Sequence, residues 1–267
     1  MRELDQREIE WYNPIYLNNR INQIIRKPGA WIMPKRMSSE FLEYLVETYE
    51  VDEDCERLPS LQDLSKQLGV SVSSLREQME VGRALGLVEA KPRTGLRRLP
   101  YSFFPAVELS LSCAIAMDQE YFLKFADLRR NLEGAYWYQA VNLLTTQDKE
   151  YLQELIGRAW QKLRGTPIQI PQDEHRELHL TIYKRLDNPF VSGILEAYWE
   201  AYEAVGLNLY AGYQYLDDVW SYHQRMVDGI CSGDLEAGFQ ALVEHTDLIR
   251  HRVIENEDGK IMVAQSD

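Results

Sequence analysis

The chain is poor in cysteine and has no long apolar run. Its 267 residues include three cysteines, Cys55, Cys113 and Cys231, and no Cys-x-x-Cys pair. This excludes a disulfide framework and a cysteine-based zinc site, and it favours a reducing compartment. No stretch approaches the roughly 20 apolar residues that cross a bilayer, and no apolar segment follows the charged start MRELDQREIE. The sequence therefore predicts a soluble, cytoplasmic protein with no secretory signal and no membrane partner.

Positive charge is also scarce, since the chain has a formal net charge of −13. One segment differs: residues 57–100 hold 8 basic and 4 acidic side chains, whereas residues 101–267 hold 14 and 26. A basic segment on an acidic body is typical of a protein in which one module meets a polyanion. An ordinary surface fits the same count equally well, so charge alone does not decide the partner.

Prolines and turn-forming residues divide the chain into parts. We expect an N-terminal extension over 1–36, a compact module over 37–99, a linker over 100–107, a helical domain over 108–255 and a tail over 256–267. Apolar residues in the long C-terminal part recur at three- and four-residue spacing, for example Leu152, Leu155 and Ile156. The sequence predicts a mainly α fold in which an all-helical antiparallel bundle follows the module.

The module contains a helix-turn-helix pattern. Leu61, Leu64 and Leu68 give a short amphipathic helix that Gly69 ends, and Ser71 is a good N-cap for a second helix. The segment Ser38 to about Glu50 would be the helix that precedes this pair.

After the second helix, the segment LVEAKPRTGLRRL alternates and has a turn at Thr94-Gly95, which predicts a two-stranded wing. Lys91, Arg93, Arg97 and Arg98 would face DNA phosphates. The candidate DNA-binding residues are Ser60, Ser71, Ser73, Ser74, Arg76, Arg93, Thr94, Gly95 and Arg97.

These residues resemble the winged helix-turn-helix of the GntR superfamily of bacterial transcription regulators. The match comprises Leu58-Pro59-Ser60, the turn Gly69-Val70-Ser71, Arg76, Gly86-Leu87-Val88 and Gly95. Gln62 and Val72 stand where the family usually has arginine, so the family's usual operator does not carry over. The resemblance implies a homodimer that binds a palindromic double-stranded DNA operator.

All five histidines follow residue 170, and four of them have a regular spacing. His175 and His179 are four apart, so one helix face would carry both. His223 and His245 lie ten residues before and twelve after Gly233, so they come level if two helices fold back there. Two level pairs of imidazoles would enclose one divalent cation. The alternative for any single histidine is a structural role in the core or on the surface, and we assign that role to His251.

The C-terminal part resembles the FCD effector domain of the FadR-like branch of the same superfamily. The match comprises Asp127 to Glu133, Leu178-His179, Asp187-Asn188-Pro189, His223, Gly233-Asp234 and His245. Metal-binding members use an aspartate and three histidines, and here His175 replaces the aspartate. Four neutral imidazoles favour zinc, nickel or copper over manganese, with zinc or nickel first. Asp173 and Glu174 are off the His179 face.

Arg129 is the candidate effector-binding residue. The resemblance implies that it pairs with the carboxylate of a small effector, and a guanidinium suits that role. An ion pair with Glu133, one helical turn away, is the structural alternative, and both roles are compatible.

The sequence thus predicts a ligand-responsive DNA-binding transcription regulator, of the repressor type, whose helical domain binds a divalent metal and a small carboxylate. It is not expected to be an enzyme. A metal-dependent hydrolase and a metal sensor without an organic effector are the alternatives. The hydrolase has the weaker support because the sequence has no His-Glu-x-x-His, Gly-x-Ser-x-Gly or phosphate-binding loop.

Overall fold

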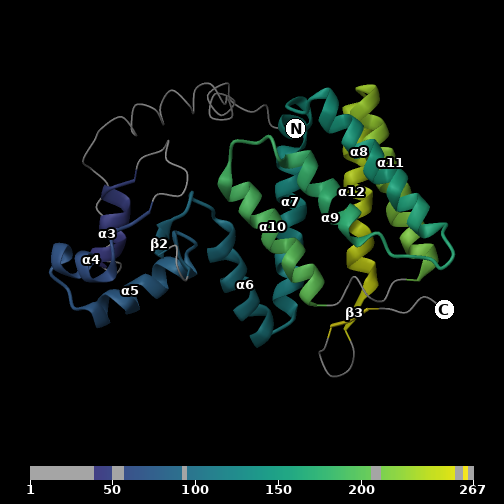
Figure 1. The fold of residues 1–267 in the computed structure, drawn as a ribbon. Helices are drawn as coiled ribbons and strands as arrows, with labels where there is room; N and C mark the ends of the chain where they lie inside the picture. The colour runs from purple at the N-terminus through teal and green to yellow at the C-terminus, as the bar shows by residue number, and fades with distance from the viewer. Residues whose placement is uncertain (1–38, 50–56, 92–94, 206–211, 256–260, 264–267) are drawn as a thin grey trace, which may run out of the picture. The chain divides into compact units, whose positions relative to one another are not determined.

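The computed structural model describes residues 39–49, 57–91, 95–205, 212–255 and 261–263. They belong to two compact units, Met1–Tyr49 and Glu50–Asp267. In the first unit, Figure 1 shows helix α3 (Glu40–Glu47). It begins after Ser39, whose hydroxyl accepts a hydrogen bond from the Leu42 N–H at 3.2 Å. The helix predicted for Ser38 to Glu50 is thus present over eight of those residues.

The second unit opens with the predicted helix-turn-helix pair and wing. Helix α4 (Leu61–Leu68) ends at Gly69, which has φ +70°, and α5 (Val72–Ala84) follows directly. Strand β1 (Val88–Lys91) pairs antiparallel with β2 (Gly95–Arg98), with Lys91 opposite Gly95. Gly95 has φ +80°, a conformation that side chains other than glycine rarely adopt.

The rest of the second unit is almost entirely helical, as predicted. Its helices are α6 (Phe104–Met117), α7 (Glu120–Asn142), α8 (Thr146–Leu163), α9 (Gln172–Tyr183), α10 (Pro189–Ala204), α11 (Tyr213–Ser232) and α12 (Leu235–Arg252). Two short strands follow, β3 (Val253–Glu255) and β4 (Ile261–Val263), which pair antiparallel.

Two elements differ from the sequence expectation. Helix α6 begins at Phe104, inside the segment predicted as a linker, because Pro105 occupies the first turn, where its fixed φ suits a helix and no N–H is needed. Strand β3 lies at the end of the segment predicted to be helical, and β4 lies within the predicted tail.

Local signals in the sequence fix the ends of the bundle helices. Asn188 accepts hydrogen bonds from the N–H groups of Phe190 and Val191 and so caps α10. Thr145 and Asp148 form a reciprocal capping box at the start of α8. Gly233, at φ +86°, ends α11 in the left-handed conformation.

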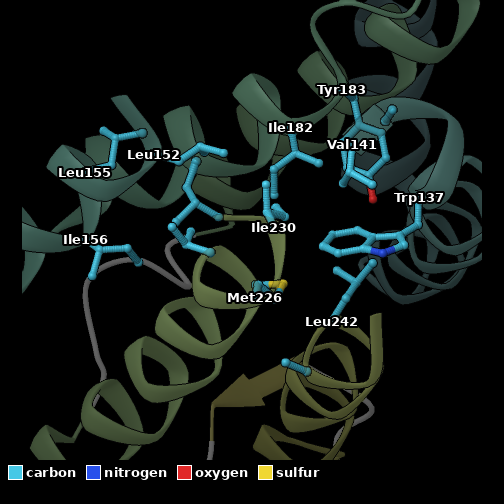
Figure 2. Close-up of a cluster of buried hydrophobic side chains, with 14 of the residues drawn as sticks. Trp137, Val141, Leu152, Leu155, Ile156, Ile182, Tyr183, Met226, Ile230 and Leu242 are labelled. Atoms are coloured by element: carbon cyan, nitrogen blue, oxygen red, sulfur yellow. The ribbon is translucent and has the colours of Figure 1, made fainter. Parts of the chain in front are cut away.

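The main core lies where α7, α8, α9, α11 and α12 meet. Figure 2 shows Trp137 and Val141 of α7 facing Ile182 and Tyr183 of α9, with Met226 of α11 beside them. A second cluster, from α6, α7 and α10, surrounds the buried Phe122, Tyr198 and Trp199. These two clusters hold α7 and α9 in the positions that the candidate site requires.

Helices α11 and α12 approach each other closely at two glycines. A Cβ added at Gly229 would lie 2.7 Å from the Gly238 nitrogen and 2.8 Å from the Asp234 oxygen. Both of these are backbone atoms, so an added methyl group could fit only if the backbone of α12 moved. This crossing fixes the spacing of the two helices that carry His223 and His245.

We predict that Gly229→Ala lowers the free energy of unfolding by about 1–3 kcal/mol, the usual cost of overpacking. Gly157→Ala is the matched control, because a Cβ there meets nothing within 4 Å in α8. It should stabilise the protein by up to about 1 kcal/mol through helix propensity. Urea unfolding of both variants measures the difference, and equal effects would refute the close approach.

Candidate functional site

Four histidines from three helices come together in the helical part of the second unit. His175 and His179 lie one turn apart on α9, His223 lies on α11 and His245 on α12. Each side chain offers one ring nitrogen, and these four atoms all lie within 4.8 Å of one another. The structure thus brings together the four residues that the histidine spacing singled out.

The nitrogen spacing suits a small cation. The His179 and His223 Nε2 atoms are 3.2 Å apart, as are those of His223 and His245. Zinc–nitrogen bonds of 2.0–2.1 Å in a tetrahedron place neighbouring ligand atoms about 3.3 Å apart. These two separations therefore match those of neighbouring ligands in a tetrahedral zinc site.

The environment keeps the four rings neutral. His179, His223 and His245 are fully buried, and burial holds the pKa of each of the four histidines well below its usual value. Three nitrogens, His175 Nε2, His223 Nδ1 and His245 Nδ1, are buried without a hydrogen-bond partner. Neutral imidazoles are the form that binds a transition metal, so the burial of these rings fits such an ion. The unpartnered Nδ1 atoms of His223 and His245 are not the nitrogens that face the cluster, which are the Nε2 atoms.

His175 stands among aromatic rings and has no carboxylate substitute beside it. Its ring centroid is 4.6 Å from that of Trp199 and 4.6 Å from that of His223. Glu174 is instead paired with Lys162 at 2.7 Å, and Asp173 is exposed. Neither acid completes the cluster, in agreement with the helical phase read from the sequence.

Arg129 and Glu133 of α7 lie directly behind His179. Arg129 is 1% exposed and Glu133 is fully buried, and their Nε and Oε2 atoms are 3.0 Å apart. The Tyr198 and Trp199 rings pack on the guanidinium, with centroids 4.4 and 5.2 Å from its central carbon. Burial raises the pKa of Glu133, and the Arg129 charge opposes that shift. The ion pair that was the structural alternative for Arg129 is therefore present.

Glu133 also contacts the histidine cluster, a contact that the sequence reading missed. Its Oε1 lies 3.0 Å from His179 Nδ1, and Arg129 Nη2 lies 2.8 Å from the same nitrogen. Glu133 and His179 are 46 positions apart in the sequence, so only the packing of α7 against α9 brings them together. One indication of this contact is present in the sequence: Arg129 and Glu133 are four residues apart, so Glu133 shares the helix face of the candidate effector-binding residue.

The predicted DNA-binding residues have two kinds of surroundings. Ser60 and Ser71 are the N-caps of α4 and α5, and their hydroxyls accept from the N–H groups of Asp63 and Ser74. Ser73 and Arg76 are exposed in the first turns of α5. Ser74 is half-buried and accepts from the Gln78 amide at 3.3 Å.

In the wing, alternation along β2 separates its two arginines. Leu96 and Arg98 are 7% and 6% exposed, because residues two apart share one strand face. The prediction that Arg98 faces phosphates is therefore wrong, whereas Arg97 is half-buried and Gly95 and Lys91 are exposed. Arg93 and Thr94 lie outside the described residues.

The neutral histidines predict a pH-dependent stability of the metal-free protein. As pH falls below about 6.5, the unfolded chain takes up protons that the buried rings reject, so stability falls with pH. The expected slope approaches 1.4 kcal/mol per pH unit for each histidine. Urea unfolding at pH 7.5, 6.5 and 5.5 measures it, and His223→Gln should reduce the slope. A pH-independent stability of the original chain would contradict the buried cluster.

Within the described ranges, no helix is both long and apolar enough to span a membrane.

Comparison with known proteins finds similarity over most of the chain. Residues 124–248 match the FCD domain family. The uncharacterized HTH-type transcriptional regulator YieP of Escherichia coli (strain K12) is 26% identical over 194 residues, which cover 69% of this chain and 80% of that protein. The solved structure of Streptococcus agalactiae GntR has the same fold, with a TM-score of 0.58 and 17% identity over 81% of this chain and 98% of that one. Residues 124–248 of the chain are thus an FCD domain, and over most of its length the chain is similar to a helix-turn-helix transcriptional regulator.

Proposed function

We propose that the chain is a DNA-binding regulator whose FCD domain holds a divalent metal ion and responds to a small carboxylate. In this proposal a homodimer binds a palindromic double-stranded operator, with one α5 helix in each of two successive major grooves. The buried cluster of four histidines is the observation that carries the metal part. Zinc or nickel is the expected ion.

Helix α5 has the features of a recognition helix. Ser73 and Arg76 are exposed near its N-terminus, while Leu75 and Met79 are buried on its opposite side. Backbone N–H groups and hydroxyls at a helix N-terminus suit phosphate oxygens, and arginine suits a guanine edge. The exposed Lys91 and Gly95 of the wing would meet the DNA backbone.

We expect Arg76→Ala to weaken binding to a selected duplex by about 1–3 kcal/mol, roughly 5- to 150-fold, because a base or phosphate contact is lost. Arg83→Ala is the matched control, since Arg83 lies at the other end of α5 and pairs with Glu80 at 3.0 Å. Fluorescence anisotropy on a duplex selected from a random pool measures both. Equal affinities for the two variants would remove α5 from the interface.

His175, His179, His223 and His245 would hold the metal, and its charge would order the three helices that carry them. A ligand that binds only the folded protein stabilises it by about 2.7 kcal/mol at 100 times its dissociation constant. The neutral rings add no negative charge, so the bound ion would keep an affinity for an anion. Arg129 is the group that would pair with a carboxylate.

We predict that the purified protein binds one equivalent of zinc or nickel and that His223→Ala abolishes this stoichiometric binding, because His223 lies between His179 and His245. His175→Asp should retain the metal and raise the relative affinity for manganese, since a carboxylate suits that ion. Elemental analysis after dialysis against each metal tests both. Unchanged metal content in His223→Ala would refute the assignment of the ligands.

One observation favours a second function, a metal sensor without an organic effector. Arg129 already has a carboxylate partner in the chain, Glu133, and is 1% exposed. The two functions differ in one variant: Arg129→Ala should abolish the response of DNA binding to a carboxylate but leave a response to the metal alone intact.

A further inference from the structure

One imidazole nitrogen of the histidine cluster faces two groups that make opposite demands on it. The Nδ1 atom of His179 lies 3.0 Å from Glu133 Oε1 and 2.8 Å from Arg129 Nη2. A carboxylate can only accept a hydrogen bond, and a guanidinium can only donate one. Nδ1 must therefore carry a hydrogen to bond Glu133, or carry none to accept from Arg129.

The choice at Nδ1 decides the state of the other ring nitrogen. A neutral imidazole has one N–H, so Nδ1–H leaves Nε2 with a free lone pair, and a bare Nδ1 places the hydrogen on Nε2. His179 Nε2 is the atom that faces the cluster, at 3.2 Å from His223 Nε2. Only the tautomer that donates to Glu133 can therefore bind a metal ion there.

We propose that Glu133 is the positioning residue of the metal site: its hydrogen bond selects the metal-binding tautomer of His179, and Arg129 favours the competing tautomer. This inference rests on the proposed metal binding. Hydrogen bonds from a metal-bound histidine to a carboxylate orient the ring and raise its basicity. The Arg129 guanidinium, whose Nε lies 3.0 Å from Glu133 Oε2, favours the ionised form of that buried carboxylate.

The test compares zinc affinity in full-length variants that differ only at Glu133. Arg129→Met removes the competing donor, and the double variant Arg129→Met/Glu133→Gln then removes the carboxylate without leaving a buried guanidinium unpaired. Competition with a chelating indicator at pH 7.5 should show the double variant binding zinc about 10- to 100-fold more weakly than Arg129→Met.

Glu177→Gln is the matched control. This acid lies on α9 with His179 but pairs with Arg158 near the surface, so zinc affinity should not change. Equal affinities for Arg129→Met and the double variant would overturn the role of Glu133.

A second readout needs no metal. Nitrogen-15 NMR of the histidine rings in the metal-free protein should show His179 with its hydrogen on Nδ1 in the original chain, and a shift toward the Nε2–H form in Glu133→Gln. A predominant Nε2–H form of His179 in the original chain would overturn the inference. If the original chain binds no zinc, the proposed metal function fails, whereas this measurement still decides the tautomer.

Discussion

Burying neutral imidazoles without enough hydrogen-bond partners is the constraint on which the helical domain depends. A buried polar nitrogen that forms no bond costs free energy, and His175, His223 and His245 each have one. For His223 and His245 this nitrogen is Nδ1, so an ion bound by the facing Nε2 atoms would leave that cost in place. The cluster also joins α9 to the helix pair α11 and α12, so an ion bound by the facing ring nitrogens would tie these three helices together.

Behind this cluster, a buried ion pair connects the histidines to the aromatic cluster of α10. Arg129 lies against Tyr198 and Trp199 and also pairs with Glu133, which reaches His179. If a carboxylate engaged Arg129, as proposed above, it would therefore change the hydrogen bonding of a candidate metal ligand. Binding effects between two such sites are reciprocal, so the metal would equally change the affinity for the carboxylate.

The sequence predicted what depends on neighbours along the chain. Gly69, Ser71 and Gly233 act within one turn, so the helix boundaries they set were readable, as was the shared face of His175 and His179. The bond between Glu133 and His179 was not, because it depends on how α7 packs on α9. The burial of Arg98 was predictable in principle, because Arg98 lies two residues from the apolar Leu96 and so shares its strand face, but its charge suggested an exposed position.

The glycine crossing of α11 and α12 would influence which ion the histidine cluster selects, if it binds one as proposed. At a rise of about 1.5 Å per residue, Gly229 is roughly 9 Å from His223 along α11, and Gly238 is roughly 10 Å from His245 along α12. These glycines nevertheless set the gap that two of the imidazoles must bridge. Bulkier residues there would widen the cage toward larger ions, so metal preference can drift during evolution while every ligating side chain stays the same.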